Sequence, residues 1–184
     1  LSIDRVTSTV QRVYFNSNTN PLSLSQEDLT TTANGPILLQ SLQGDIVVRS
    51  GTDGEPGISA NGSGNVLLQT VAGTILTQAD VQSDSGHITL NSFGDLVINE
   101  HIRTSGLGTI YLVSQGAISI ESLTTNNANL GVSAVGDIQL GSINAGNGNV
   151  FLTTPSRIID NTSLSTGRNI TASGLTMFAE DGIG

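Results

Sequence analysis

Two glutamates stand out first in this chain of 184 residues, because their spacing could bring two carboxylates together. Each lies two residues before a recurring apolar position, Ile102 for Glu100 and Leu123 for Glu121. If these positions stack in a repeating structure, the carboxylates lie about 5 Å apart, where like charges repel. Such a pair can act as acid and nucleophile in a retaining glycosidase, or hold a cation. The plainer interpretation is a solvated pair relieved by Arg103.

A second acidic pair, Asp53 and Glu55, lies in the glycine-rich segment 51–57. Calcium needs six to eight oxygen ligands, and the segment lacks both the acidic spacing of a calcium hand and the nonapeptide of calcium β-rolls. We interpret it as a turn and expect no cofactor. Calcium at one of the two acidic pairs is the secondary hypothesis.

Tyr111 and Phe151 are the candidates for ligand binding. They fall on the same outward position of two repeats, with Gly131 on the repeat between them. Strand spacing would separate the two aromatic residues by about 9.6 Å. Such a slot could stack on a sugar or a partner; simple filling of the surface is the alternative.

No further catalytic constellation is present in the sequence. His87 and His101 are the only histidines, and neither a G-x-S-x-G nucleophile motif nor an H-E-x-x-H metal pair occurs. We therefore predict no catalytic residue, and a protein that is not an enzyme.

The elements that must position these residues are visible as a ladder of apolar pairs. The first members fall at 66, 88, 110, 130, 150 and 170, so the steps are 22, 22, 20, 20 and 20 residues. A fixed period of this size is typical of a solenoid, in which each repeat buries its apolar face only against its neighbours. The pairs are Val66/Leu68, Ile88/Leu90, Ile110/Leu112, Leu130/Val132, Val150/Leu152 and Ile170/Ala172.

Two further ladders run in phase with the first, and no helical spacing persists. Three apolar sites per period indicate three short strands per coil, each pairing with its equivalents in the neighbouring coils. The sequence thus predicts an all-β, single-stranded parallel β-helix of about six coils of 20–22 residues. The second ladder holds Ile46/Val48, Ile75/Thr77, Leu96/Ile98, Ile118/Ile120, Ile138/Leu140 and Ile158/Asp160; the third holds Ile58, Val81, Ile102, Leu123, Ile143 and Leu164.

Turn residues repeat as well. Glycine, which supplies positive φ, stands just before eight of the predicted strands and is often followed by Asn or Asp. Asn129, Asn149 and Asn169 fall one period apart, which predicts side chains stacked along the axis. Asp137 and Arg157 fall on adjacent coils, which predicts an ion pair.

The period does not cover the whole chain. Residues 1–35 carry no ladder register, so we expect an N-terminal β-rich cap, cover or linker there, and the β-helix over 36–184. The segment 51–57 stretches one coil to 29 residues and should loop out of the wall. The chain starts without a signal peptide and ends inside a repeat, so we expect a fragment of a longer polypeptide with flanking domains as partners.

Composition excludes several classes of partner. The net charge is −9, and the six basic residues are scattered arginines without any lysine, which argues against nucleic acid and anionic membrane surfaces. No run of about 18 apolar residues is present, so we expect no membrane span. Cysteine is absent, so the ladders themselves must supply the stability.

Four repeat units show the texture of a known family. The units beginning at Gly64, Gly86, Gly94 and Gly136 read GNVLL, GHITL, GDLVI and GDIQL. They resemble the β-helical stalks of filamentous-haemagglutinin-type exoproteins and of giant bacterial surface repeat proteins, over roughly residues 36–184. The resemblance implies an extracellular or cell-surface, non-enzymatic, structural or adhesive segment whose polar wall contacts cells, glycans or proteins.

Two alternative functions stay open. A carbohydrate-active β-helix enzyme, either a polysaccharide lyase or a glycosidase, would be expected to gather basic and acidic side chains on one wall, and the arginines here are scattered. An ice- or surface-binding solenoid would need regular Thr-x-Thr rows, and the outward columns of this chain are more mixed than that.

Overall fold

The computed structural model consists of strands, turns and loops over the residues it describes. Side chains are described for residues 29–50, 55–162 and 167–184, and strands of the backbone alone for 2–3, 6–8, 13–17 and 24–27. These segments contain 23 strands, paired in parallel in two sheets, and no helix. The predicted all-β class and the parallel β-helix are confirmed.

One sheet has eight strands and receives one strand from each coil. Neighbours in this sheet follow chain order, so every strand pairs with its equivalents one coil before and after. From β6 to β22 the chain completes six coils, as predicted. The strands are β3 (Val13–Ser17), β6 (Ile37–Ser41), β9 (Val66–Thr70), β12 (Ile88–Ser92), β14 (Ile110–Ser114), β16 (Leu130–Ala134), β19 (Asn149–Thr154) and β22 (Gly174–Ala179).

The other sheet has fifteen strands in two rows, which the long strands β13 (Leu96–Thr104) and β15 (Ile118–Thr124) join. The first row holds β1 (Ser2–Ile3), β4 (Leu24–Glu27), β7 (Ile46–Arg49), β10 (Ile75–Gln78), β17 (Ile138–Leu140), β20 (Arg157–Asp160) and β23 (Gly182–Ile183). The second row holds β2 (Val6–Ser8), β5 (Leu29–Thr31), β8 (Ile58–Ala60), β11 (Val81–Ser83), β18 (Ser142–Asn144) and β21 (Ile170–Thr171).

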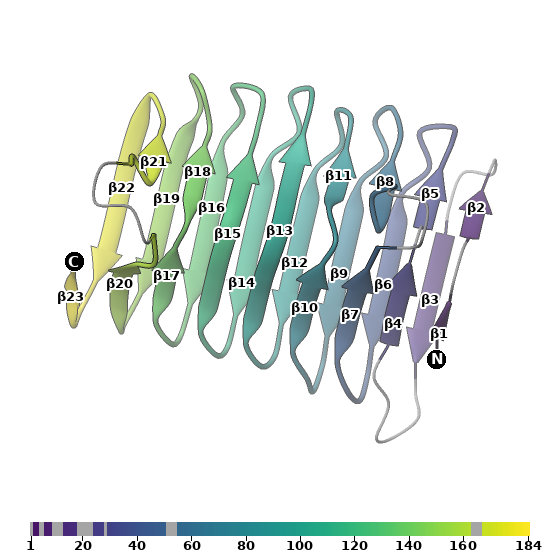
Figure 1. Ribbon diagram of the computed structural model, residues 1–184, viewed down its shortest axis with the longest axis horizontal. Coiled ribbons are helices and arrows are strands. Elements are labelled where there is room, and N and C mark those ends of the chain that lie inside the picture. Colours follow the sequence, from purple (N-terminus) through teal and green to yellow (C-terminus); the bar gives the residue numbers. More distant parts are fainter. Residues whose placement is uncertain are drawn as a thin grey trace.

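Each coil is flattened into two layers. In Figure 1 the fifteen-stranded sheet lies in front and the eight-stranded sheet behind it, with their strands running in opposite directions. The coils follow one another from the N-terminus on the right to the C-terminus on the left. Apolar side chains from both layers meet between them and form one continuous core.

The registers confirm most of the predicted ladders. Ile110 is 1% exposed and has Ile88 and Leu130 as its strand partners. The second ladder holds its register from Ile46 to Ile158. The first ladder holds from position 66 to 150, and the third from 58 to 143.

The prediction is wrong at the C-terminal end of the first ladder. Ile170 pairs with Ile143 and so belongs to the third ladder, while Leu175 follows Val150 in the first. A longer connection after β20 delays the third strand of this coil, and counting a fixed period could not show that delay. Leu164 lies outside the described residues.

The predicted absence of register in residues 1–35 is also wrong. β1, β2 and β3 pair in parallel with β4, β5 and β6. The described strands of this segment therefore extend both sheets towards the N-terminus, and the ladders begin before residue 36. Its role as a cap stays a prediction.

Glycine is required just before several strands of the eight-stranded sheet, because neighbouring coils approach closely there. A Cβ at Gly86 would overlap the carbonyl oxygen of Gly64, and a Cβ at Gly108 would overlap that of Gly86. None of these three has a positive φ, whereas Gly44, before β7, has a φ of 107°. The predicted reason, positive φ, thus holds at Gly44 and is wrong at the other three.

Turn side chains bond the next coil. Asn129 Oδ1 accepts the backbone N–H of Asn149 at 2.9 Å, and Asp95 Oδ1 accepts that of Ala117 at 2.8 Å. The predicted asparagine column is therefore correct for its first two members. Asn169 is not part of it, because Gly174 takes that position.

Coil length varies mainly at one corner, between the two rows of the fifteen-stranded sheet. In each coil we count the residues from the last inward residue of the first-row strand to the first inward residue of the second-row strand. This step is 10 residues from Val48 to Ile58. It is 4 residues from Ile98 to Ile102, and 3 from Ile120 to Leu123. We call this place the variable corner.

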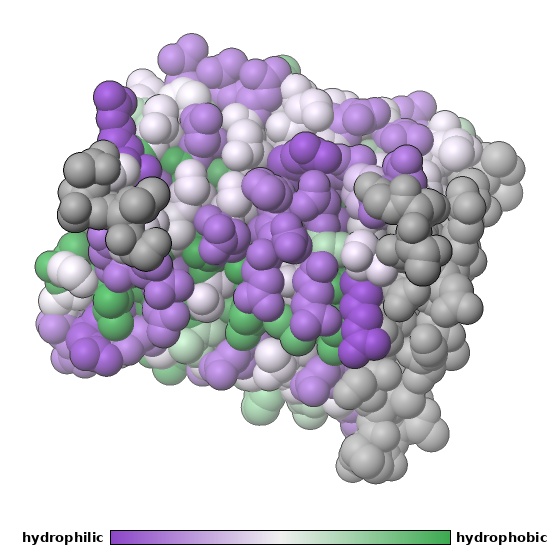
Figure 2. All heavy atoms as spheres, in the orientation of Figure 1, coloured by the Kyte–Doolittle hydropathy of each residue, from purple (hydrophilic) through white to green (hydrophobic). Residues whose placement is uncertain are grey.

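The outer face of the fifteen-stranded sheet mixes polar and apolar side chains. Figure 2 shows hydrophilic side chains gathered over the middle of this face, with hydrophobic ones between them along its lower half. Outward residues of the first row, such as Val47, Leu76 and Val97, are half-buried. None of the described segments is a helix long and apolar enough to cross a membrane.

Replacing Ile110 by Asp should cost several kcal/mol of unfolding free energy, because it buries an unpaired charge between two coils. Val113→Asp on the same strand is the matched control, since Val113 is outward and half-buried, and it should cost far less. Thermal unfolding followed by circular dichroism measures both. Equal melting of Ile110→Asp and the wild type would contradict the register.

Candidate functional site

The predicted ligand-binding pair lies on the outer face of the eight-stranded sheet. Tyr111 of β14 pairs with Gly131 of β16, which pairs with Phe151 of β19. The two aromatic side chains are 49% and 45% exposed. Their predicted alignment across a glycine is confirmed, and their binding of a ligand stays a prediction.

Glycine at position 131 leaves room for one edge of the Tyr111 ring. A Cβ at Gly131 would stand 2.8 Å from Cδ2 and 3.0 Å from Cε2 of Tyr111. This edge of the ring therefore occupies the space above the glycine, in the manner of an aromatic side chain that shields a cross-strand glycine. Beside it opens a hollow of about 340 Å³, which we call the aromatic hollow; its lining residues are Thr109, Ile110, Tyr111, Asn129, Leu130, Gly131 and Phe151.

Two polar side chains on the rim of the aromatic hollow are held by neighbouring coils. Asn129 Oδ1 accepts the N–H of Asn149 at 2.9 Å, which leaves the amide NH₂ group to donate elsewhere. Thr109 Oγ1 lies 2.8 Å from Nδ1 of His87, and the same nitrogen accepts the N–H of Thr109 at 3.1 Å. The rim thus offers fixed hydrogen-bonding groups beside two aromatic surfaces. The sequence prediction missed both residues, although each directly precedes a strand of the first ladder.

The glutamate pair lies at an irregularity of the strand pairing. The register between β13 and β15 shifts between Ile98 and His101, so that Asn99 and Glu100 together stand opposite Glu121. Two residues opposite one define a β-bulge, which redirects side chains. A shared metal or glycosidase role for these two glutamates stays a prediction.

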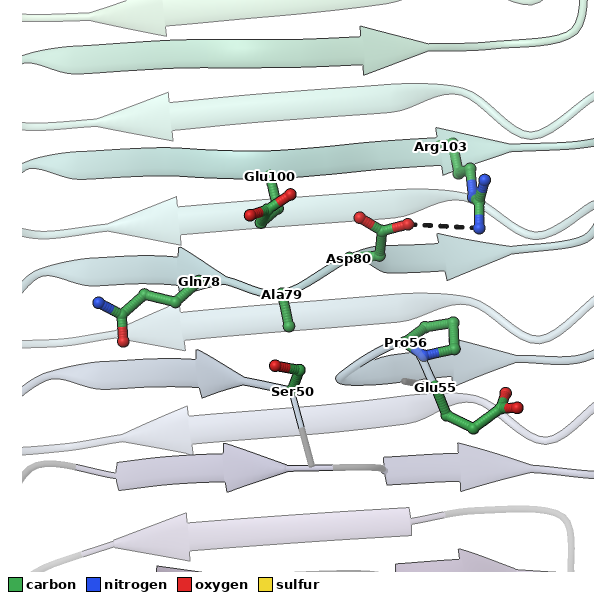
Figure 3. Close-up of a pocket in the computed structure, with 8 residues that line it drawn as sticks. All are labelled: Ser50, Glu55, Pro56, Gln78, Ala79, Asp80, Glu100 and Arg103. Atoms are coloured by element: carbon green, nitrogen blue, oxygen red, sulfur yellow. Dashed lines mark ion pairs between the residues drawn. The ribbon is translucent and has the colours of Figure 1, made fainter. Parts of the chain in front are cut away.

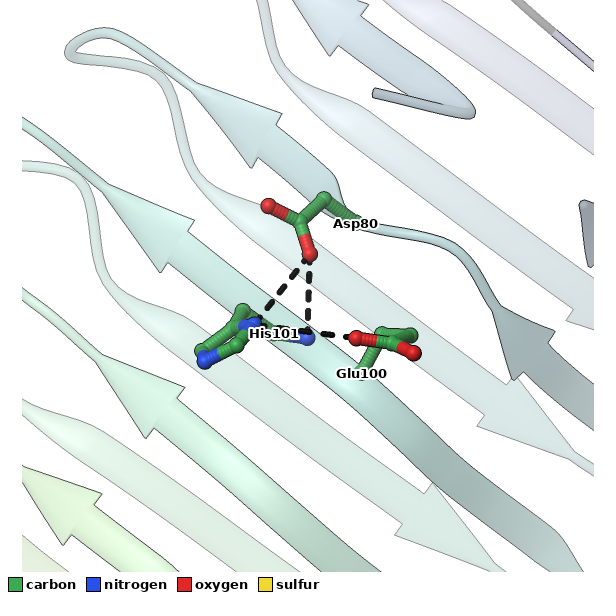
Figure 4. Close-up of side chains that lie close together, drawn as sticks. All are labelled: Asp80, Glu100 and His101. Atoms are coloured by element: carbon green, nitrogen blue, oxygen red, sulfur yellow. Dashed lines mark hydrogen bonds and ion pairs between the residues drawn. The ribbon is translucent and has the colours of Figure 1, made fainter. Parts of the chain in front are cut away.

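Glu100 gathers with residues of its own and the preceding coil. Asp80, Glu100 and His101 each offer a ligand atom, and these atoms lie within 4.8 Å of one another. Figure 4 shows Asp80 bonded to His101, whose Nδ1 lies 3.3 Å from Asp80 Oδ1 and 3.9 Å from Glu100 Oε2. The backbone N–H of His101 donates to the same Asp80 oxygen at 3.2 Å.

Arg103 neutralises part of this acidic cluster. Its guanidinium lies 3.3 Å from Asp80 Oδ2, and Figure 3 shows the ion pair at the edge of a hollow of about 350 Å³ in the variable corner. Glu55 also lines this hollow, whereas Asp53 lies outside the described residues. Asp80 already bonds Arg103 and His101, so this member of the cluster has its partners within the protein.

Period counting could have found the missed partners Asp80 and His101. Val81 pairs with Ile102, so the residues just before them must be neighbours on adjacent coils. The sequence prediction named His101 but did not pair it with Asp80 on the preceding coil.

The predicted ion pair between Asp137 and Arg157 is confirmed. Arg157 donates from Nη2 to Asp137 Oδ2 at 2.6 Å and from its backbone N–H to Oδ1 at 3.1 Å. The guanidinium first, then the Ser156 hydroxyl and the Arg157 N–H, lower the pKa of Asp137 from 3.8 to about 2. Both side chains contact solvent, so the pair serves to close a turn between coils.

Comparison with known protein families, with curated proteins and with solved structures gives no match. The geometry of the chain itself must therefore carry any functional argument.

Removing the guanidinium in Arg157→Gln should raise the pKa of Asp137 from about 2 towards 3.8. The lowered pKa stabilises the fold above pH 3.8, and this contribution is lost as the pH falls through about 2. Carboxyl-carbon NMR titration measures the midpoint, with the exposed Arg168 changed to Gln as the control. An unchanged midpoint in Arg157→Gln would contradict the assigned cause.

Proposed function

We propose that this chain is a structural and adhesive segment of a large secreted or cell-surface bacterial protein. The observation that supports it is the continuous pairing of eight strands in one wall. A wall of this kind presents outward side chains at fixed positions, about 4.8 Å apart along the axis. Flanking domains of the same polypeptide, and a cell-surface glycan or protein, are the proposed partners.

Repetition favours contact by many weak sites. Equivalent outward positions recur on each coil, so a partner with repeated units can engage several at once, and effective concentration then raises the overall affinity. The net charge of −9 and the scattered arginines disfavour nucleic acid. The absence of cysteine fits a fold whose inter-coil ladders replace disulfides in an extracellular setting.

Four of the described aspartates, Asp45, Asp80, Asp95 and Asp137, bond residues of the protein itself. Asp137 bonds Arg157, and Asp80 bonds Arg103 and His101. Asp45 and Asp95 each accept a backbone N–H from the next coil. These contacts favour an adhesive role over the hydrolase or lyase that the glutamate pair could suggest.

Beads coated with the chain should bind a subset of a panel of cells saturably, whereas albumin-coated beads should not. The same protein, incubated with a polysaccharide panel, should release no reducing ends or unsaturated products. Turnover that disappears in Glu121→Gln would overturn the proposal in favour of an enzyme. Failure of the beads to bind any cell would contradict the adhesive role.

A further inference from the structure

At the aromatic hollow, residue size changes sharply along one outward column of the eight-stranded sheet. Strand partners in this column run Leu67, Thr89, Tyr111, Gly131 and Phe151. The column thus places a residue without a side chain between two aromatic rings. Only six aromatic residues occur in the whole chain, and two of them border this one hollow.

Both aromatic residues are exposed to solvent, and the sheet constrains the ring of Tyr111. One edge of this ring fills the space above Gly131, since a Cβ there would stand 2.8 Å from Cδ2 and 3.0 Å from Cε2. A flat apolar surface held in place can accept the apolar face of another ring with little loss of side-chain entropy.

The residues that line the aromatic hollow indicate which class of ligand it can bind. None of the seven described residues that line the hollow is charged. The chain carries a net charge of −9, which repels polyanions. At about 340 Å³ the hollow is at the lower end of small-molecule sites. The rim supplies the Asn129 amide NH₂ and the Thr109 hydroxyl, which can bond hydroxyl groups of a ligand.

We propose that the aromatic hollow binds a neutral hexopyranose unit of a glycan. The apolar face of the sugar ring stacks on Tyr111 against Phe151, and its hydroxyls bond Asn129 and Thr109. This inference rests on the proposed adhesive function and specifies its ligand: a neutral glycan, not an acidic one.

The test is an NMR titration of the ¹⁵N-labelled chain with cellohexaose, maltoheptaose and mannohexaose. Each sugar is added to about 10 mM, because we expect a Kd near 1 mM for one shallow site. The backbone amides of Tyr111, Gly131 and Phe151 should shift with at least one of them, and polygalacturonate should have no effect. Phe151→Ala should weaken binding roughly tenfold. Phe93→Ala is the matched control, because Phe93 is 59% exposed in a turn, and it should bind as the wild type does.

Two further variants separate a role in binding from a role in folding. Tyr111→Phe keeps the ring and should retain binding. Gly131→Ala keeps both rings but places a methyl group 2.8 Å from Cδ2 of Tyr111, so the ring must shift from its position beside the hollow and binding should fall. Normal binding by Gly131→Ala and Phe151→Ala, or no shift with any neutral sugar, would overturn the proposal.

The outcome can be told apart from failure of the adhesive function. Cell binding that depends on Tyr111, but that none of these sugars inhibits, would support adhesion while assigning the hollow to a protein partner. Sugar binding without any cell binding would keep the site and contradict the adhesive role.

Discussion

The strands that the structure describes pair with their equivalents in the adjacent coils of the solenoid. Equivalent residues therefore stack in columns about 4.8 Å apart. Most residues of the inward columns are apolar, because a polar or smaller side chain would lose contacts with both neighbouring coils. Outward columns are free of that demand, so a change of residue type along them, as from Tyr111 to Gly131 to Phe151, produces a local shape that no single coil contains.

Column stacking also explains how much of the fold the sequence could predict. The second ladder was assigned correctly from Ile46 to Ile158, because the connections that lead into it from the eight-stranded sheet keep nearly constant length. Ile170 was misassigned because period counting assumes a constant coil, and the connection before it is longer. At the bulge, the spacings themselves reveal one extra residue before Ile102, whereas the direction that Glu100 then takes depends on its neighbours Asp80 and His101.

The polar groups of the turns were harder to interpret from sequence than the apolar ladders. Asn and Asp are typical turn residues, yet the structure uses Asn129 and Asp95 as acceptors for the next coil. The reason is geometric: coils lie one strand spacing apart, so the nearest unpaired N–H group belongs to the adjacent coil. The aromatic hollow was predictable as an alignment, while the inclination of the Tyr111 ring over Gly131 and the polar rim were not.

The variable corner separates what the solenoid must conserve from what it can change. Its connection runs from 3 residues in the coil of β15 to 10 in the coil of β7, while the strands on both sides keep their registers. Sequence can therefore be gained or lost there without disturbing the core. One edge of the molecule thus works as a row of grafting points, at which foreign peptides, such as epitopes, could be displayed in single file at intervals of one coil.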